Sequence, residues 1–325
     1  MTIEKRGTSY RIRQTVNGER YSITVPYKPS KKEAFDLIQD KINHRVNTQI
    51  SFDDAAKQYI KVKSNVLSPS TIRGYNTILR NIPDKFKAYD INEINDFTVQ
   101  KLINDYSSDH EPKSVRNLNG FISAVIRLFI PSMVFHITLP QKKRKSPYTP
   151  SVDDVKRLLD ESADTEYYVA LYLAVMSLRR SEICALTIDD LSDDNMLTIN
   201  KALVPSDDGY VLKETPKTDA SYRTVVIPDD VAGRIREQGY VFKYQPQAID
   251  QYIRRTLPKL GIPQFSVHKL RHFFASYAHD LGYSDAQIQK MGGWATDNVM
   301  KAVYRHAMEM DEAKKSIAND FKALS

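Results

Sequence analysis

A run of four basic residues divides this chain of 325 residues: Lys142, Lys143, Arg144 and Lys145. Four adjacent like charges repel one another and cannot pack together in one apolar core, so we expect the run to be extended or solvated. A serine and a proline follow it at once, which favours an irregular backbone. The run therefore predicts a linker between domains, and a chain of this length is long enough for two or three of them.

The first 45 residues predict a small sheet packed on one helix. Alternating apolar and polar side chains predict three short strands, over residues 3–6, 9–16 and 20–27. Asn17-Gly18 is a typical hairpin turn between the last two strands. Ser30 and Glu33 have the spacing of a capping box, which predicts the first turn of a helix. On the second strand, Arg11 and Arg13 share the outer face of the sheet.

Residues 50–140 predict a compact bundle of four helices. The periodicity of apolar residues predicts helices over residues 52–62, 72–79, 96–106 and 113–129. A turn rich in capping residues, Ser68 to Thr71, precedes the second of them. The fourth is amphipathic, with Val115, Leu118 and Ile122 on its apolar face. By itself, this pattern fits many helical bundles.

The remaining residues, 148–325, predict an α-rich domain with a small antiparallel sheet. Ser151 caps a helix over residues 152–161, and an apolar helix follows over residues 167–178. Strands are predicted at residues 196–199, 210–213 and 223–227.

The tail predicts one more helix, over residues 311–324. Ala313, Ile317, Phe321 and Leu324 fall on one of its faces at helical spacing. An apolar face has to be buried, so we expect the tail helix to pack either on its own domain or on a neighbouring copy of the chain.

Composition narrows the function classes. The chain is 41% hydrophobic, which suffices for packed cores, but it has no apolar run of membrane-spanning length and no apolar signal core near its start, so we expect no export. Its single cysteine, Cys184, excludes an internal disulfide and fits a reducing cytoplasm. No Cys/His cluster has zinc-ligand spacing and no glycine-rich phosphate loop is present, so we expect neither a metal nor a cofactor. The net charge of +7 mildly favours a polyanionic partner.

One stretch near the C-terminus holds a set of residues suited to a phosphate. His268 and Arg271 are three residues apart, so they share one face of a helix. The only tryptophan, Trp294, follows a glycine pair, and Tyr304 comes ten residues later. Cationic groups and an indole N–H can hold phosphate oxygens, and a phenol can attack phosphorus. Each feature alone is common, but their order and spacing together are much more specific.

With these residues in view, the chain resembles the tyrosine recombinases of the phage-integrase type. KRGTSYRIR and SKKEA resemble an arm-type DNA-binding domain over residues 1–45, and SFDDAAKQYI, SPSTIRGY and PKSVRNLNGFISAV resemble a core-binding domain over residues 50–140. Residues 148–325 resemble the catalytic domain. The resemblance implies a multidomain, mainly α fold: a small three-stranded sheet plus helix, a four-helix domain, and an α-rich domain with a small antiparallel sheet.

The six catalytic positions of that family are all filled, in the right order: Arg179, Lys217, His268, Arg271, Trp294 and Tyr304. Arg179 precedes the acidic Glu182 by three residues, and Lys217 lies in PKTDASYR. Trp294 stands where many members have a second histidine and some have tryptophan. Its indole can contribute a hydrogen bond and packing but no proton transfer.

The resemblance implies that Tyr304 attacks a DNA phosphodiester and forms a 3′-phosphotyrosine intermediate. Arg179 and Arg271 would stabilise the added negative charge of the transition state, because fixed cations bind it more strongly than the ground state. His268 is the candidate base for the tyrosine proton, and Lys217 is the candidate acid for the leaving 5′-oxygen. No ATP is needed, since the tyrosine linkage retains the energy of the broken bond.

The implied function is an integrase that cuts and rejoins two DNA duplexes and moves a phage or other mobile element. The implied partners are double-stranded DNA at core and arm sites, further copies of the chain in a tetramer with tail helices docked in trans, and accessory DNA-bending or directionality proteins. The implied location is the cytoplasm, on the nucleoid. A topoisomerase acting on one duplex and a catalytically silent DNA-binding regulator are the alternatives; the arm-type segment argues against the first and the six filled positions against the second.

Basic residues outside the six positions have two interpretations each. Arg11 and Arg13 form either a solvated face or a surface that lies in a DNA groove. The basic residues 142–145 either solubilise the linker or follow the phosphate backbone while two domains clamp a duplex.

Removing residues 1–45 should weaken binding to distant arm sites and leave cleavage of a core site intact. The physical reason is that the predicted sheet and helix form a separate unit that carries Arg11 and Arg13. Gel-shift measurements with separate arm and core duplexes check this. Unchanged arm binding by the truncated protein would contradict the domain assignment.

Overall fold

The computed structural model describes residues 1–16, 18–43, 49–141, 148–214, 222–294 and 296. The chain folds as two compact units, Met1–Arg144 and Lys145–Ser325. The boundary between the units coincides with the predicted basic linker, whose residues 142–145 lie outside the described part of the chain. The described secondary structure is mainly helical with small antiparallel sheets, which confirms the predicted fold class. A further division of the first unit near residue 45 stays a prediction.

The first unit begins with a three-stranded antiparallel sheet and one helix. These elements are β1 (Thr2–Arg6), β2 (Ser9–Val16), β3 (Glu19–Val25) and α1 (Lys31–Asn43). Val16 pairs with Glu19, so β2 and β3 form the predicted hairpin. The predicted capping box is also present, since the backbone N–H of Glu33 donates to Ser30 Oγ (3.1 Å) and that of Ser30 to Glu33 Oε2 (3.4 Å). The core between sheet and helix consists of Ile12, Val25, Ala34 and Ile38.

The rest of the described first unit is a helical bundle. Its helices are α2 (Phe52–Lys63), α3 (Pro69–Asn81), α4 (Asp84–Lys87), α5 (Asp96–Ser107) and α6 (Pro112–Phe129). The four predicted helices are all present, and the one-turn α4 is an addition that is too short to show periodicity. Tyr59, Tyr75 and Phe121 pack as an aromatic cluster where α2, α3 and α6 meet, with ring centroids 4.9 to 6.2 Å apart. None of the described helices is long and apolar enough to cross a membrane.

The second unit is built mainly of helices. They are α7 (Val152–Ser162), α8 (Tyr168–Val175), α9 (Arg180–Ile183), the 3-10 turn η1 (Ile188–Asp190), α10 (Asp229–Gln238), α11 (Pro246–Thr256), α12 (His268–Asp280) and α13 (Asp285–Gly292). Helix α8 is apolar on every side, and it lies buried among α7, α10 and α12. Helix α8 therefore packs against α12, and the turn that follows α8 lies beside α12. Both the turn and α12 carry residues of the candidate site.

Two small antiparallel sheets lie between α9 and α10 in the sequence. β4 (Met196–Ile199) pairs with β7 (Arg223–Val226), and β5 (Ala202–Ser206) pairs with β6 (Gly209–Lys213). The sequence pattern predicts one sheet and misses β5, whose alternation is interrupted by Pro205. The Asp208-Gly209 pair is a hairpin signal at the start of β6, and it could have indicated that a partner strand, β5, precedes it. Gly209 has a φ of 123°, which favours glycine.

The end of α8 differs from the predicted helix over residues 167–178. The helix ends at Val175, and Ser177 has a φ of 78°, in the left-handed region. A continuous helix cannot pass through a residue in that conformation. The apolar run continues through the turn, so periodicity alone gives no sign of it.

Candidate active site

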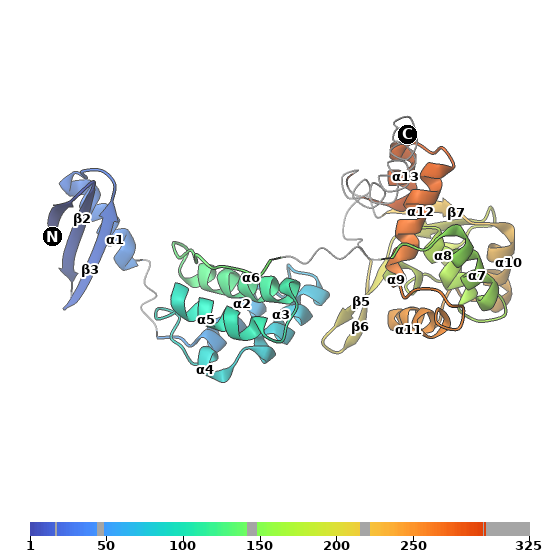
Figure 1. Ribbon diagram of the computed structural model, residues 1–325, viewed down its shortest axis with the longest axis horizontal. Coiled ribbons are helices and arrows are strands. Elements are labelled where there is room, and N and C mark those ends of the chain that lie inside the picture. The colour runs from blue at the N-terminus through green and yellow to red at the C-terminus, as the bar shows by residue number, and fades with distance from the viewer. Residues whose placement is uncertain (17, 44–48, 142–147, 215–221, 295, 297–325) are drawn as a thin grey trace, which may run out of the picture. The chain divides into compact units, whose positions relative to one another are not determined.

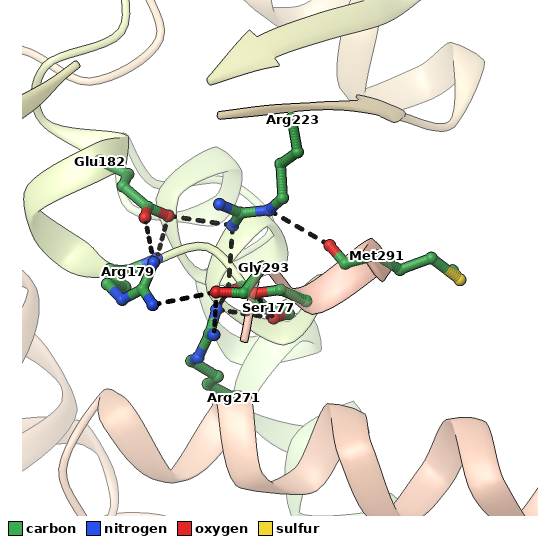
Figure 2. Close-up of polar contacts among 8 residues, drawn as sticks. Ser177, Arg179, Glu182, Arg223, Arg271, Met291 and Gly293 are labelled. Carbon is green, nitrogen blue, oxygen red and sulfur yellow. Dashed lines mark hydrogen bonds and ion pairs between the residues drawn. The ribbon is translucent and has the colours of Figure 1, made fainter. Parts of the chain in front are cut away.

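The candidate site is centred on a carboxylate that two arginines share. Glu182, on α9, is 4% exposed. Its Oε1 accepts from Arg179 Nη1 (2.5 Å), and its Oε2 accepts from Arg223 Nη2 (3.0 Å) and from the backbone N–H of Arg179 (2.9 Å) (Figure 2). Burial would raise the pKa of this carboxyl, but Arg223 and Arg179 outweigh burial, and the pKa is lowered. Glu182 is therefore ionised and holds two cations in fixed directions.

Arg179 and its neighbour Arg180 point in different directions. The guanidinium of Arg179 reaches Glu182 and the backbone oxygen of Gly293 (Nη2 to O, 3.2 Å), and about a third of its side chain stays exposed. Arg180 instead forms an ion pair with Asp250 on α11. The structure thus brings Arg179, and not Arg180, into the cluster.

Arg223, the first residue of β7, is a member of the cluster that the sequence analysis gave no role. It is 7% exposed, and besides Glu182 it donates through Nε to the backbone oxygen of Met291 (3.2 Å) and through Nη2 to that of Ser177 (3.4 Å). It ties β7 to the turn after α8 and to the end of α13. The sequence signal that could have identified Arg223 is its position at the end of the segment PKTDASYR, where it begins a strand.

Arg271, on the first turns of α12, is the most deeply buried of the three arginines, at 2% exposed. Its Nη1 donates to the backbone oxygen (2.5 Å) and to Oγ (2.9 Å) of Ser177, and its Nη2 lies 3.4 Å from the backbone oxygen of Gly293. Burial, with the nearby cations Arg179 and Arg223, lowers the pKa of Arg271 to about 9. The guanidinium therefore stays charged at neutral pH, but its charge is incompletely compensated.

Trp294 packs against Arg271 and is buried from solvent. It is 6% exposed, and the guanidinium carbon of Arg271 lies 4.0 Å from the centre of its ring, a cation–π contact. Phe274 of α12 stacks on the same indole at 6.3 Å. A Cβ at Gly292 would lie 1.7 Å from the indole, so this position must be glycine. Gly293 has a φ of 63°, which ends α13 and turns its carbonyl toward the arginines.

His268 lies at the start of α12, one turn before Arg271, on the exposed side of the cluster. Partial burial removes water from the imidazole of His268 and, together with the positive charges of Arg271 and Arg179, lowers its pKa. His272 lies against it with ring centroids 5.0 Å apart, and burial, with Lys269 and His268, lowers the pKa of His272 to about 4. Both imidazoles are therefore neutral at pH 7, which suits His268 to accept a proton.

The structure brings together four of the six predicted catalytic residues: Arg179, His268, Arg271 and Trp294. Lys217 and Tyr304 lie outside the described residues, as do the predicted linker contacts and the tail helix. Arg11 and Arg13 lie on β2; Arg13 is exposed and forms an ion pair with Glu4 (3.6 Å). Within the described chain, no group of three or more His, Cys, Asp or Glu side chains is placed to hold a metal ion.

The cluster has the electrostatics of an anion site. Within the part of the chain that the structure describes, three guanidinium charges lie close to one carboxylate charge in a largely buried group. Cations gathered in a largely buried group attract an anion more strongly than cations in water do. A planar fork such as that of Arg179, which is partly exposed, can bind two oxygens of one phosphate.

Comparisons with known proteins agree with these features. The chain matches the family model "Phage integrase family" over residues 151–310 and the model "Phage integrase, N-terminal SAM-like domain" over residues 51–107. No curated protein sequence matches it.

Solved structures with a similar fold come from DNA complexes of integrases and recombinases. The Tn1549 transposon integrase in complex with transposon right end DNA has a TM-score of 0.67 and 16% identity, covering 83% of this chain and 99% of that one. A lambda integrase tetramer bound to a Holliday junction has a TM-score of 0.56 and 13% identity, covering 93% and 94%. The XerH site-specific recombinase bound to a palindromic substrate has a TM-score of 0.58 and 15% identity, covering 90% of each chain. At these identities, the likeness establishes the fold alone.

Replacing Glu182 by Gln should lower the free energy of unfolding by about 3–5 kcal/mol, because the buried guanidinium of Arg223 and the partly exposed one of Arg179 lose their counter-charge. The pKa of Glu182 is lowered in the folded state, so its stabilisation is present above the ordinary carboxyl pKa and is lost as pH falls through the lowered value. The difference in the free energy of unfolding between wild type and Glu182→Gln should therefore become smaller below about pH 4. Denaturant unfolding at a series of pH values measures it.

The matched control is Asp153→Asn, which removes an exposed ion pair with Arg157 in the same unit. That change should cost less than about 1 kcal/mol. Equal losses in the two variants would mean that Glu182 does not hold the cluster together.

Proposed function

This chain is a member of the phage integrase family, and on that premise we propose that it is a site-specific DNA recombinase that cuts and rejoins DNA through a 3′-phosphotyrosine intermediate. The observation that carries the proposal is the group formed by Arg179, Arg223 and Arg271, which lies beside a neutral His268 and holds one carboxylate, Glu182, among the described residues. Such a group suits a phosphodiester whose negative charge grows during attack.

In the proposed reaction, the phenol oxygen of Tyr304 forms a bond to phosphorus while the bond from phosphorus to the 5′-oxygen breaks. Arg179 and Arg271 stabilise the nonbridging oxygens of the transition state. His268 takes the phenol proton, and Lys217 gives a proton to the leaving 5′-oxygen. Rejoining reverses these steps with a 5′-hydroxyl as the nucleophile, so the bond energy is kept in the tyrosine linkage.

Trp294 contributes to this reaction through Arg271. Its indole lies under the guanidinium, so it limits the directions in which Arg271 can point. This role needs no titratable group, which fits a tryptophan at a position where many family members have histidine.

The wider function that we propose is the integration and excision of a phage or other mobile element. The partners would be double-stranded DNA at core and arm sites, contacted in part by Arg11 and Arg13, and three further copies of the chain. The similar lambda integrase forms a tetramer on a Holliday junction, which supports a tetramer here. In that assembly the tail helix over residues 311–324 would dock on a neighbouring copy, with accessory DNA-bending or directionality proteins acting on the complex.

Arg179→Ala should lower the rate of cleavage by several orders of magnitude, whereas Arg180→Ala should lower it far less. The reason is that Arg179 faces the cluster while Arg180 pairs with Asp250. Single-turnover cleavage of a nicked core-site duplex measures both rates. Equal losses would contradict the assignment of Arg179 as the phosphate-binding residue.

Tyr304→Phe should bind DNA with unchanged affinity and form no covalent complex, since it lacks only the phenol oxygen. Incubation with a nicked core-site duplex followed by denaturing electrophoresis detects the adduct. A protein–DNA adduct that survives denaturant in this variant would exclude Tyr304 as the nucleophile, and an absence of adduct in the wild type as well would favour the silent regulator.

A further inference from the structure

Ser177 adopts a backbone conformation that normally favours glycine. Its φ is 78°, and it is fully buried in the turn between α8 and α9. The left-handed region is strained for an L-residue, and serine tolerates it less well than asparagine does. Among the described residues, the other non-glycine residue with positive φ is an asparagine, Asn195 (φ 57°). A glycine at position 177 would make the same turn without strain.

The serine hydroxyl makes contacts that glycine could not make. Its Oγ accepts from Arg271 Nη1 (2.9 Å) and lies 3.4 Å from the backbone oxygen of Gly292, to which it donates. It therefore joins the guanidinium on α12 to the end of α13, just before Trp294. The backbone oxygen of Ser177 also accepts from Arg271 and Arg223, but a glycine would keep that oxygen.

We propose that Ser177 is a positioning residue whose hydroxyl fixes the guanidinium of Arg271 and couples it to the Gly292–Trp294 segment. The strained backbone persists because the hydroxyl is needed where the turn places it. This inference rests on the proposed role of Arg271 in phosphate binding.

The geometry explains why a carbonyl alone does not suffice. One face of the Arg271 guanidinium rests on the Trp294 ring, and Nη2 reaches Gly293 only at 3.4 Å. The two shorter hydrogen bonds of Arg271 both go to Ser177, whose backbone oxygen and Oγ accept from Nη1. With the hydroxyl removed, Nη1 keeps one of those acceptors and the guanidinium plane can turn.

Two substitutions separate the hydroxyl from the strain. Ser177→Gly removes both the hydroxyl and the strain, so cleavage of a nicked core-site duplex should fall about ten-fold or more, the loss expected for a hydrogen bond to a charged group. Its melting temperature should lie above that of a variant that keeps the strain. Ser177→Ala removes the hydroxyl but keeps the strain, so it should lose cleavage to the same extent and melt below wild type. If Ser177 served stability alone, cleavage by Ser177→Gly at temperatures below its melting temperature would equal that of the wild type, and that result would overturn the proposal.

A second arm tests whether Ser177 acts through Arg271. In an Arg271→Lys background, adding Ser177→Gly should lower cleavage less than two-fold, because the coupled partner is already gone. A full ten-fold additional loss would overturn the proposal. Asn195→Gly is the matched control, since it also relieves a positive φ in the same unit but lies away from the arginine cluster, where its amide donates to Asp229. It should cleave like wild type, and a loss equal to that of Ser177→Gly would assign the effect to backbone flexibility.

A readout without DNA keeps this inference separate from the proposed recombinase function. Nitrogen NMR of the arginine side chains, with the Arg271 signal identified by its loss in Arg271→Lys, reports how fast its guanidinium rotates. Rotation should be slow in the wild type and faster in Ser177→Gly and Ser177→Ala. An unchanged Arg271 signal in both variants overturns the positioning role, whether or not the wild type cleaves DNA. If the wild type fails to cleave but the signal changes as expected, the proposed function is wrong and the positioning role stands.

Discussion

The candidate site depends on one buried carboxylate. Glu182 lies where α9, β7 and the turn after α8 meet, and it accepts hydrogen bonds from two guanidiniums and a backbone N–H. A carboxylate can be buried at such a place only if cations compensate it, and buried arginines need an anion in return. The mutual requirement fixes Arg179 and Arg223 in direction as well as in position, which is what an electrostatic site needs.

Backbone carbonyls accept hydrogen bonds from the arginine N–H groups that do not donate to Glu182. The oxygens of Ser177, Met291 and Gly293 accept from the three arginines, and they come from the turn after α8 and from the end of α13. Met291 lies in the last turn of α13, where the carbonyls have no partner within the helix, and Ser177 and Gly293 lie just past the ends of α8 and α13. Helix termination therefore supplies the acceptors, and left-handed residues at Ser177 and Gly293 aim them.

The result is a group that is rigid but electrically unbalanced. Among the described residues, three cations share one full negative charge and several carbonyl dipoles. Burial, with the cations Arg179 and Arg223, lowers the pKa of Arg271 to about 9, and burial, with Arg271 and Arg179, lowers that of His268. Stability alone would favour replacing such a group by apolar side chains. Its presence in the core of a unit that matches the phage integrase family agrees with the phosphate-binding role that we propose for it.

The sequence by itself determined which long segments form helices and which nearby residues share one face of a helix. Periodicity predicted the four helices of the first unit, and the spacing of His268 and Arg271 put them on one helix, because these signals lie within a few neighbouring residues. Tertiary structure alone decided that Arg223 pairs with Glu182, 41 residues away, and that the carbonyl of Gly293 reaches Arg179 across 114 residues. The turn at Ser177 is hidden in an apolar run, since its left-handed backbone is stabilised by Arg271 and Arg223, and partners so distant leave no local pattern in the sequence.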